Sequence, residues 1–186
     1  MSAQPARKLF SVNEYDELIA SGFFVGKKRV ELIEGELIEK MVQGDSHIGC
    51  VNRLNRIFNR GLNDDFIVSV QNAFAANTYS APEPDIAIQR FRADFYSTAK
   101  ATPEDTLLVI EVSDSTIRFD RQVKIPLYAR AGIRESWIVN LPRKILEVHR
   151  EPKNGRYEVV QKLQRGETVA PLAFPELTLK ISDIIG

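Results

Sequence analysis

The sequence predicts a single domain of the mixed α/β class, in which helices flank a central mixed β-sheet. Strand-like and helix-like segments follow one another without strict alternation, which favours a mixed sheet over a purely parallel one. The unbroken apolar run Leu107–Ile110 is typical of a central strand buried on both faces. A chain of 186 residues is long enough for one substantial core, so we expect residues 1–186 to form one domain.

The N-terminal part is expected to add a short helix and a β-hairpin to this core. Residues 1–10 are expected to form a loose arm. Ser11, with Glu14 three residues later, is a capping-box pattern that predicts the start of a helix. The stretch KRVELIEGELIEKM, residues 28–41, predicts two strands joined at its central Glu-Gly pair.

A longer helix is predicted over residues 45–62, DSHIGCVNRLNRIFNRGL. Asp45 or Ser46 can cap its start, and apolar residues repeat along one of its faces. A narrow basic stripe runs along the roughly opposite face and consists of Arg53, Arg56 and Arg60. This stripe either follows the phosphates of a bound DNA or is an ordinary solvated helix face.

The rest of the chain predicts six strands, at residues 66–74, 84–89, 106–112, 135–140, 144–150 and 156–163. Residues 115–133 follow a helical pattern, but Pro126 lies inside it and predicts either a kink or a break between two helices. Residues 177–185 can add a short edge element.

Composition restricts the classes of function. The chain has 25 Lys and Arg residues and 25 Asp and Glu residues, so a nucleic-acid partner would have to bind a local patch. A single cysteine, Cys50, excludes an intrachain disulfide and a cysteine-based zinc site. The sequence has neither a signal-peptide core nor an apolar run of roughly 18 residues, so we expect a cytoplasmic protein without a membrane partner.

Two carboxylates stand out as candidates for chemistry. Asp85 begins one predicted strand and Glu111 ends another, so adjacent strands would place them side by side. Clustered carboxylates repel each other, and a divalent cation removes that repulsion. The alternative is structural, with Asp85 capping a turn and Glu111 pairing with a nearby arginine.

The motif Pro84-Asp85, followed by Glu111-Val112-Ser113, resembles the Pro-Asp…(Asp/Glu)-x-Lys nuclease superfamily, whose fold is restriction-endonuclease-like. Within it, the stretches VELIEGELIE, PEPDIAI and DRQVKIPLYARAGIRESWIVN resemble the Uma-two family of endonucleases, over roughly residues 11 to 150. The resemblance implies a metal-dependent endonuclease that hydrolyses DNA phosphodiester bonds. It also implies a homodimer, the common state in the superfamily.

The resemblance further implies the metal ligands. Asp85 and Glu111 would bind Mg²⁺ or Mn²⁺, and the backbone carbonyl of Val112 would add another oxygen. Glu31 resembles the extra acidic residue that some superfamily members place beside this site. The alternative for Glu31 is a solvent-facing strand residue.

The superfamily lysine is absent, because position 113 is a serine. Lys124 on the following helix is a candidate replacement, and lysine migration of this kind is known in the superfamily. Asp120, Lys124 and Tyr128 are four residues apart and share one face if the helix is continuous. The alternative is an exposed Asp120–Lys124 pair, and a kink at Pro126 would turn Tyr128 away.

The two histidines are weaker candidates. His47 lies near a predicted helix start and can approach the site, although a helix cap or a surface position is the more ordinary role. His149 alternates with Val148 and is expected to be exposed. The substitution at Ser113 and the zero net charge also leave a second function open. This is a catalytically inactive nucleic-acid-binding or assembly module on the same fold.

Overall fold

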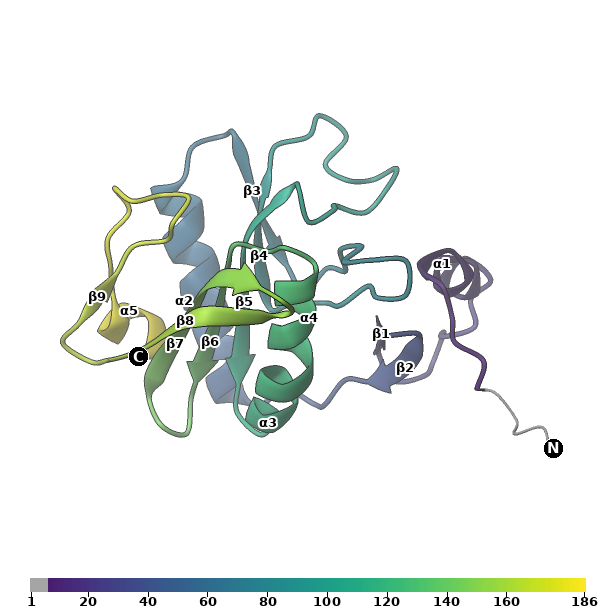
Figure 1. Ribbon diagram of the computed structural model, residues 1–186, viewed down its shortest axis with the longest axis horizontal. Helices are drawn as coiled ribbons and strands as arrows, with labels where there is room; N and C mark the ends of the chain where they lie inside the picture. The colour runs from purple at the N-terminus through teal and green to yellow at the C-terminus, as the bar shows by residue number, and fades with distance from the viewer. Residues whose placement is uncertain (1–6) are drawn as a thin grey trace.

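A computed structural model, which describes residues 7–186, has a six-stranded mixed sheet at its centre (Figure 1). The strand order is β3-β4-β5-β6-β7-β8, with β5 and β6 parallel and all other neighbours antiparallel. The strands are β3 (Phe66–Val70), β4 (Ile86–Arg90), β5 (Thr106–Ser113), β6 (Glu135–Asn140), β7 (Ile145–Lys153) and β8 (Arg156–Gln164). The predicted fold class is therefore confirmed.

Helices cover both faces of the sheet and divide the core into two layers. On one face lie α2 (Asp45–Gly61) and α5 (Ile181–Ile185), and Phe58 of α2 packs near Trp137 of β6. On the other face lie α3 (Ile117–Phe119), the π-helical turn η1 (Asp120–Lys124) and α4 (Ile125–Arg130). These three segments form the crossover that a parallel β5–β6 pair requires.

The crossover stays helical through Pro126. Proline lacks an amide N–H and crowds the carbonyl four residues before it. Here the turn just before it widens, so that the Ile125 N–H donates to the carbonyl of Asp120, and Pro126 falls in the first turn of α4. A new α-helix thus begins at Ile125, as one predicted alternative had it, but a π-turn joins it to α3, and Tyr128 is not turned away from the site.

The N-terminal elements lie beside the main sheet (Figure 1). The capping box of α1 (Val12–Ala20) forms as predicted, with Ser11 Oγ accepting from the amide of Glu14 at 3.2 Å. Strands β1 (Val30–Ile33) and β2 (Glu36–Glu39) make the predicted hairpin. Residues 1–6 of the expected arm lie outside the described residues, whereas the Phe10 amide donates to the Gly35 carbonyl at 2.9 Å.

One local prediction was wrong, and another was incomplete. The N-cap of α2 is Gly44, which has no side-chain acceptor, so neither Asp45 nor Ser46 caps this helix. The tail is more elaborate than an edge element, because β10 (Leu179–Lys180) pairs with β9 (Thr168–Val169) and α5 then packs into the core. Across residues 7–186, no helix has the length and apolar character needed to cross a bilayer.

Candidate active site

The register of β4 against β5 brings the two predicted carboxylates together. Ile86 is paired with Ile110, and continuing this antiparallel register by one residue sets Asp85 opposite Glu111. Both side chains are almost fully buried, and both line a cavity of about 400 Å³ at this edge of the sheet. The predicted adjacency of the two carboxylates is present.

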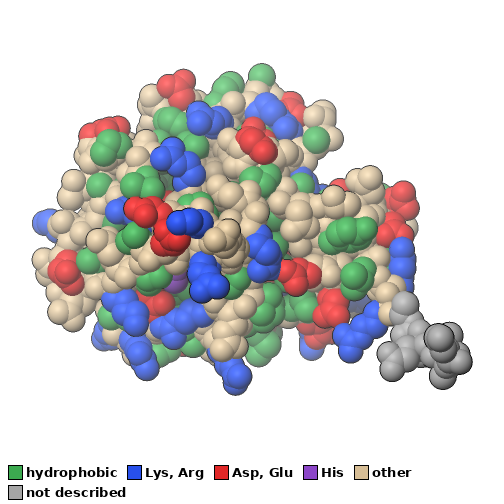
Figure 2. Space-filling model, viewed as in Figure 1, with side chains coloured by type: hydrophobic (Ala, Val, Ile, Leu, Met, Phe, Trp, Pro, Cys, Tyr) green, Lys and Arg blue, Asp and Glu red, His purple; other side chains and the backbone are tan. Residues whose placement is uncertain are grey.

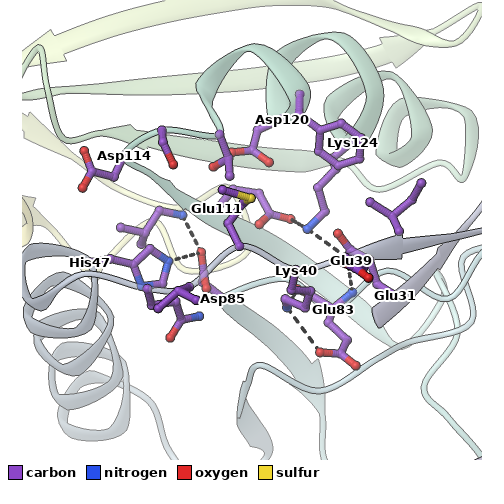
Figure 3. Close-up of a pocket in the computed structure, with 18 of the residues that line it drawn as sticks. Glu31, Glu39, Lys40, His47, Glu83, Asp85, Glu111, Asp114, Asp120 and Lys124 are labelled. Carbon is purple, nitrogen blue, oxygen red and sulfur yellow. Dashed lines mark hydrogen bonds and ion pairs between the residues drawn. The ribbon is translucent and has the colours of Figure 1, made fainter. Parts of the chain in front are cut away.

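Asp85 is held from three directions, and Figure 3 draws two of these contacts, including that of His47. Its Oδ2 accepts the backbone N–H of Val112 at 2.8 Å and lies 3.0 Å from Nε2 of His47, while its Oδ1 accepts the side-chain Nε2–H of Gln71 at 3.1 Å. Burial acts to raise the pKa of Asp85, but the hydrogen bonds from His47 and Val112 outweigh burial and lower it. Asp85 is therefore an ionised carboxylate in a buried site.

The backbone of Val112 faces the same opening. In a β-strand, the N–H and C=O of one residue point to the same edge. Because the Val112 N–H points at Asp85, beyond the last paired residue of β4, its carbonyl faces that side as well. The carbonyl is thus oriented toward the side of the sheet where the two carboxylates lie.

Lys124 reaches this site from the π-turn. Its Nζ lies 2.8 Å from Glu111 Oε1 and 3.2 Å from Glu31 Oε2, and the residue is only 3% exposed (Figure 3). The Tyr128 hydroxyl donates to the same Glu111 oxygen. The exposed Asp120–Lys124 pair considered above is therefore wrong, and so is a solvent-facing Glu31, since all three side chains are buried.

The charges of this cluster are unbalanced. Burial raises the pKa of Glu111 to about 8, although the Lys124 ammonium acts in the opposite direction. Burial by itself would lower the pKa of Lys124, but the charges of Glu111 and Glu31 raise it. Burial is thus the main cause of the Glu111 shift, whereas the neighbouring carboxylates cause that of Lys124. A divalent cation can stabilise several carboxyl groups that crowd around a single amine.

Ser113 stands where the nuclease motif has a lysine, and its side chain holds the crossover helix instead. It follows Glu111 by two residues and therefore points to the same face of β5. Its Oγ donates to Asp120 Oδ2 at 2.6 Å, and Thr116 Oγ1 donates to the same oxygen at 2.7 Å. These contacts anchor the first residue of the π-turn to the strand end, four residues before Lys124.

His47 belongs to the site and is neither a cap nor a surface residue. It lies in the first turn of α2, is buried, and contacts Asp85 through Nε2. Its Nδ1 is a buried atom without a hydrogen-bond partner among residues 7–186. Gln71 was missed by the sequence reasoning, because its role depends on a φ of 53° just after β3, which no local pattern signals.

The arginine stripe of α2 does not gather at the cavity. Arg53 Nε donates to the carbonyl of Ile184 in the C-terminal helix at 3.1 Å. Arg56 and Arg60 are exposed one and two turns further from the N-terminal end of α2, and neither lines the cavity. One of the three arginines thus has a structural contact.

The donor set suits a hard cation. No three His, Cys, Asp or Glu side chains within residues 7–186 form a group that could hold a metal ion. The site offers the carboxylates of Asp85 and Glu111 and the Val112 carbonyl. Zinc sites use three or four nitrogen, sulfur or oxygen ligands from the protein, whereas Mg²⁺ keeps several waters and takes one or two carboxylates. The residues therefore fit Mg²⁺ or Mn²⁺ and not zinc.

Residues 12–182 match the model of the Uma2 family, which is described as "Putative restriction endonuclease". Among solved structures, the chain is similar to a crystal structure from Anabaena variabilis ATCC 29413, described as "a putative nuclease belonging to DUF820". That protein is 16% identical with a TM-score of 0.68, and the match covers 95% of this chain and 97% of that chain. A search of curated proteins gives no match.

Proposed function

The chain belongs to the Uma2 family of restriction-endonuclease-like proteins, and on that premise we propose that its cavity hydrolyses DNA phosphodiester bonds with Mg²⁺ or Mn²⁺. The observation that carries the proposal is the convergence of Asp85, Glu111 and Lys124 at one buried cavity. A carboxylate pair beside a lysine is the set that this chemistry needs, although the lysine comes from a helix and not from the strand.

In this proposal Asp85, Glu111 and the Val112 carbonyl are the metal ligands. When bound, the metal lowers the pKa of a coordinated water and offsets the charge on the scissile phosphate. The hydrogen bonds to Asp85 fix the orientation of its carboxylate before any ligand arrives. The contacts of Lys124 and Tyr128 both use Oε1 of Glu111, which leaves Oε2 for a ligand.

Lys124 is the proposed catalytic cation. Its ammonium lies beside Glu111, where it can orient the attacking water or stabilise charge that develops on the phosphate. Glu31 is proposed as a positioning residue, since its Oε2 holds Lys124 and also accepts the Glu83 amide at 2.9 Å. Tyr128 positions the Glu111 carboxylate in a similar way. His47 positions Asp85.

Nicking of supercoiled plasmid DNA tests the proposal. Wild-type protein with Mg²⁺ or Mn²⁺ should convert the plasmid to open circles, and Asp85→Asn should remove this activity. Arg134→Gln is a matched control, because Arg134 is exposed and precedes β6 at the other end of the sheet. Cleavage that survives in Asp85→Asn, or that needs no divalent cation, would overturn the assignment.

Cutting both strands of a duplex in one binding event takes two such cavities, so we also propose that the active form is a homodimer. Double-strand breaks should then increase more steeply with protein concentration than single-strand nicks do. Equal dependence of both products on protein concentration contradicts this part of the proposal.

A second candidate is an inactive DNA-binding or assembly module. It is favoured by the ion pair between Lys124 and Glu111 and by the hydrogen bonds on both oxygens of Asp85, which occupy groups that a metal would need. Titration calorimetry with Mn²⁺ distinguishes the two functions. Binding that Glu111→Gln weakens supports the nuclease, whereas absent or indifferent binding supports the module.

A further inference from the structure

Four exposed cations lie along one edge of the molecule, next to the candidate active site. They are Arg118 of α3, Arg143 and Lys144 of the turn between β6 and β7, and Lys162 of β8. We call these four residues the basic strip. Lys and Arg side chains gather along the lower edge of this face, over α3 and the β6–β7 turn (Figure 2).

The backbone ties the basic strip to the active site. The amide of Leu141, at the start of the β6–β7 turn, donates at 3.0 Å to the carbonyl of Ser113, two residues after Glu111. Arg118 precedes Phe119, which lines the cavity. Lys162 of β8 lies opposite Glu147 of β7 in the strand register, and the Glu147 carboxylate accepts a hydrogen bond from Arg121 of the π-turn.

The basic strip carries its charges without direct ion pairs, and only Lys162 lies across a strand from an acidic residue, Glu147. Some cations elsewhere on the surface, such as Arg92 and Lys153, are paired with acidic side chains, whereas others, such as Arg134, have no ion pair among the described residues. No member of the basic strip has such a partner within residues 7–186, and Arg118 hydrogen-bonds only the neutral Gln122. The exposed Asp114 near the cavity lies on the α2 side, close to Gly44.

We propose that the basic strip binds the phosphate backbone of duplex DNA and leads it to the cavity. This inference rests on the proposed function, because it assigns the substrate surface of that same site. A chain of zero net charge attracts a polyanion only through a local concentration of free cations. The strip provides this concentration beside the carboxylates, whereas the α2 arginines lie farther along their helix.

The test measures binding without cleavage. A fluorescent duplex oligonucleotide is titrated with full-length protein in EDTA at several salt concentrations, and the slope of log K against log [salt] is recorded by anisotropy. Each lost phosphate contact reduces the slope by about 0.9. Arg143→Gln/Lys144→Gln should therefore lower it by about 1.8. Both side chains are exposed, and circular dichroism checks the fold.

Two control double variants each remove two positive charges at other places on the surface. Arg134→Gln/Arg156→Gln alters exposed cations at the opposite end of the sheet, and Arg56→Gln/Arg60→Gln alters the α2 stripe. Both should keep the wild-type slope. The inference is overturned if the wild type shows no salt-dependent binding, or if Arg143→Gln/Lys144→Gln keeps the wild-type slope. It is also overturned if the slope of either control variant falls by as much as that of Arg143→Gln/Lys144→Gln. Because EDTA prevents metal-dependent cleavage, an inactive protein that still binds through the strip overturns the proposed function alone.

Discussion

Lys124 combines near-complete burial with contacts to two carboxylates, so the electrostatics of the whole site depend on this one side chain. A buried cation is tolerated only when it is paired, and an amine between Glu31 and Glu111 meets that condition. The same pairing fixes the amine at the edge of the cavity. Stability and proposed chemistry therefore depend on the same contact, and they must be measured separately.

We expect Lys124→Met to lower the single-turnover rate of plasmid nicking by about 10²- to 10³-fold, the usual loss when one preorganised electrostatic contact is removed. Methionine keeps an unbranched apolar stem, so packing changes little. Mn²⁺ affinity, measured by calorimetry, should not weaken, because the cation that competes for Glu111 is gone. A folded variant with a near wild-type rate would contradict the role of Lys124.

His149 makes stability sensitive to acid. The side chain is 7% exposed, and its Nε2 has no hydrogen-bond partner among residues 7–186. Burial lowers the pKa of His149 from its ordinary value of 6.5 to about 4. Because the pKa is lower in the folded state, the unfolded chain takes up the proton first as the pH falls. The contribution to stability is complete above the unfolded pKa and is lost toward the folded pKa.

We expect His149 alone to lower the free energy of unfolding by roughly 2 kcal/mol between about pH 7.5 and about pH 5. Urea denaturation of wild type and His149→Phe at both pH values measures it. The difference between the two proteins isolates His149 from carboxyl groups that also titrate, and phenylalanine can keep the ring contact with Tyr157. Equal losses in both proteins would contradict the expectation.

The burial of the two histidines could not be predicted from the sequence. His149 was expected to be exposed, and for His47 a helix cap or a surface position was the more ordinary role, yet both are buried. Alternation along β7 does not distinguish an exposed face from one covered by a helix, because both faces of this sheet are covered. Asp85 and Glu111 were predictable, since each stands at the end of an apolar strand pattern.

The π-turn is the element that delivers Lys124, and two contacts hold it against the sheet. Asp120 is bound by Ser113 of β5, and Arg121 forms a two-point ion pair with Glu147 of β7. Glu147 is almost fully buried, whereas Arg121 is partly exposed. The accessible Arg121 therefore supplies the counter-charge for the buried Glu147 carboxylate.

We expect Arg121→Met to destabilise the protein by about 2 kcal/mol, because it leaves the buried Glu147 carboxylate without its cation. Adding Glu147→Gln should recover much of the loss, since the amide needs no counter-charge. Chemical denaturation of the wild type, both single variants and the double variant gives the coupling energy. Additive effects of the two substitutions would show that the pair does not hold the turn.

Elements with local signals were predicted well, and elements set by distant contacts were not. The hairpin β1–β2, the buried strand β5 and the capping box of α1 follow from patterns within a few residues. The π-turn arises from Pro126 together with contacts to β5 and β7. The pairing of β9 with β10, and the packing of α5 against α2, join segments whose association no short pattern encodes.

At the scale of the whole molecule, a neutral chain separates its charges. Carboxylates collect inside the cavity, and four exposed cations without an ion-pair partner among residues 7–186 lie on the adjacent basic strip. The restriction-endonuclease-like fold was predictable because its motifs occur in a fixed order along most of the chain. The separation of charge was not, because net charge carries no information about position.

This separation predicts that a divalent cation stabilises the folded protein. The unfolded chain disperses Asp85 and Glu111, so we expect Mn²⁺ to bind the native state preferentially. At 100 times Kd the gain is about 2.7 kcal/mol, which for a chain of this length raises Tm by roughly 5 to 10 °C. Differential scanning fluorimetry with and without Mn²⁺ measures the shift. Glu111→Gln should remove most of it and Arg134→Gln none, because only the first substitution alters the cavity. An equal shift in all three proteins would place the cation elsewhere on the molecule, and the buried carboxylates would then serve only to hold Lys124.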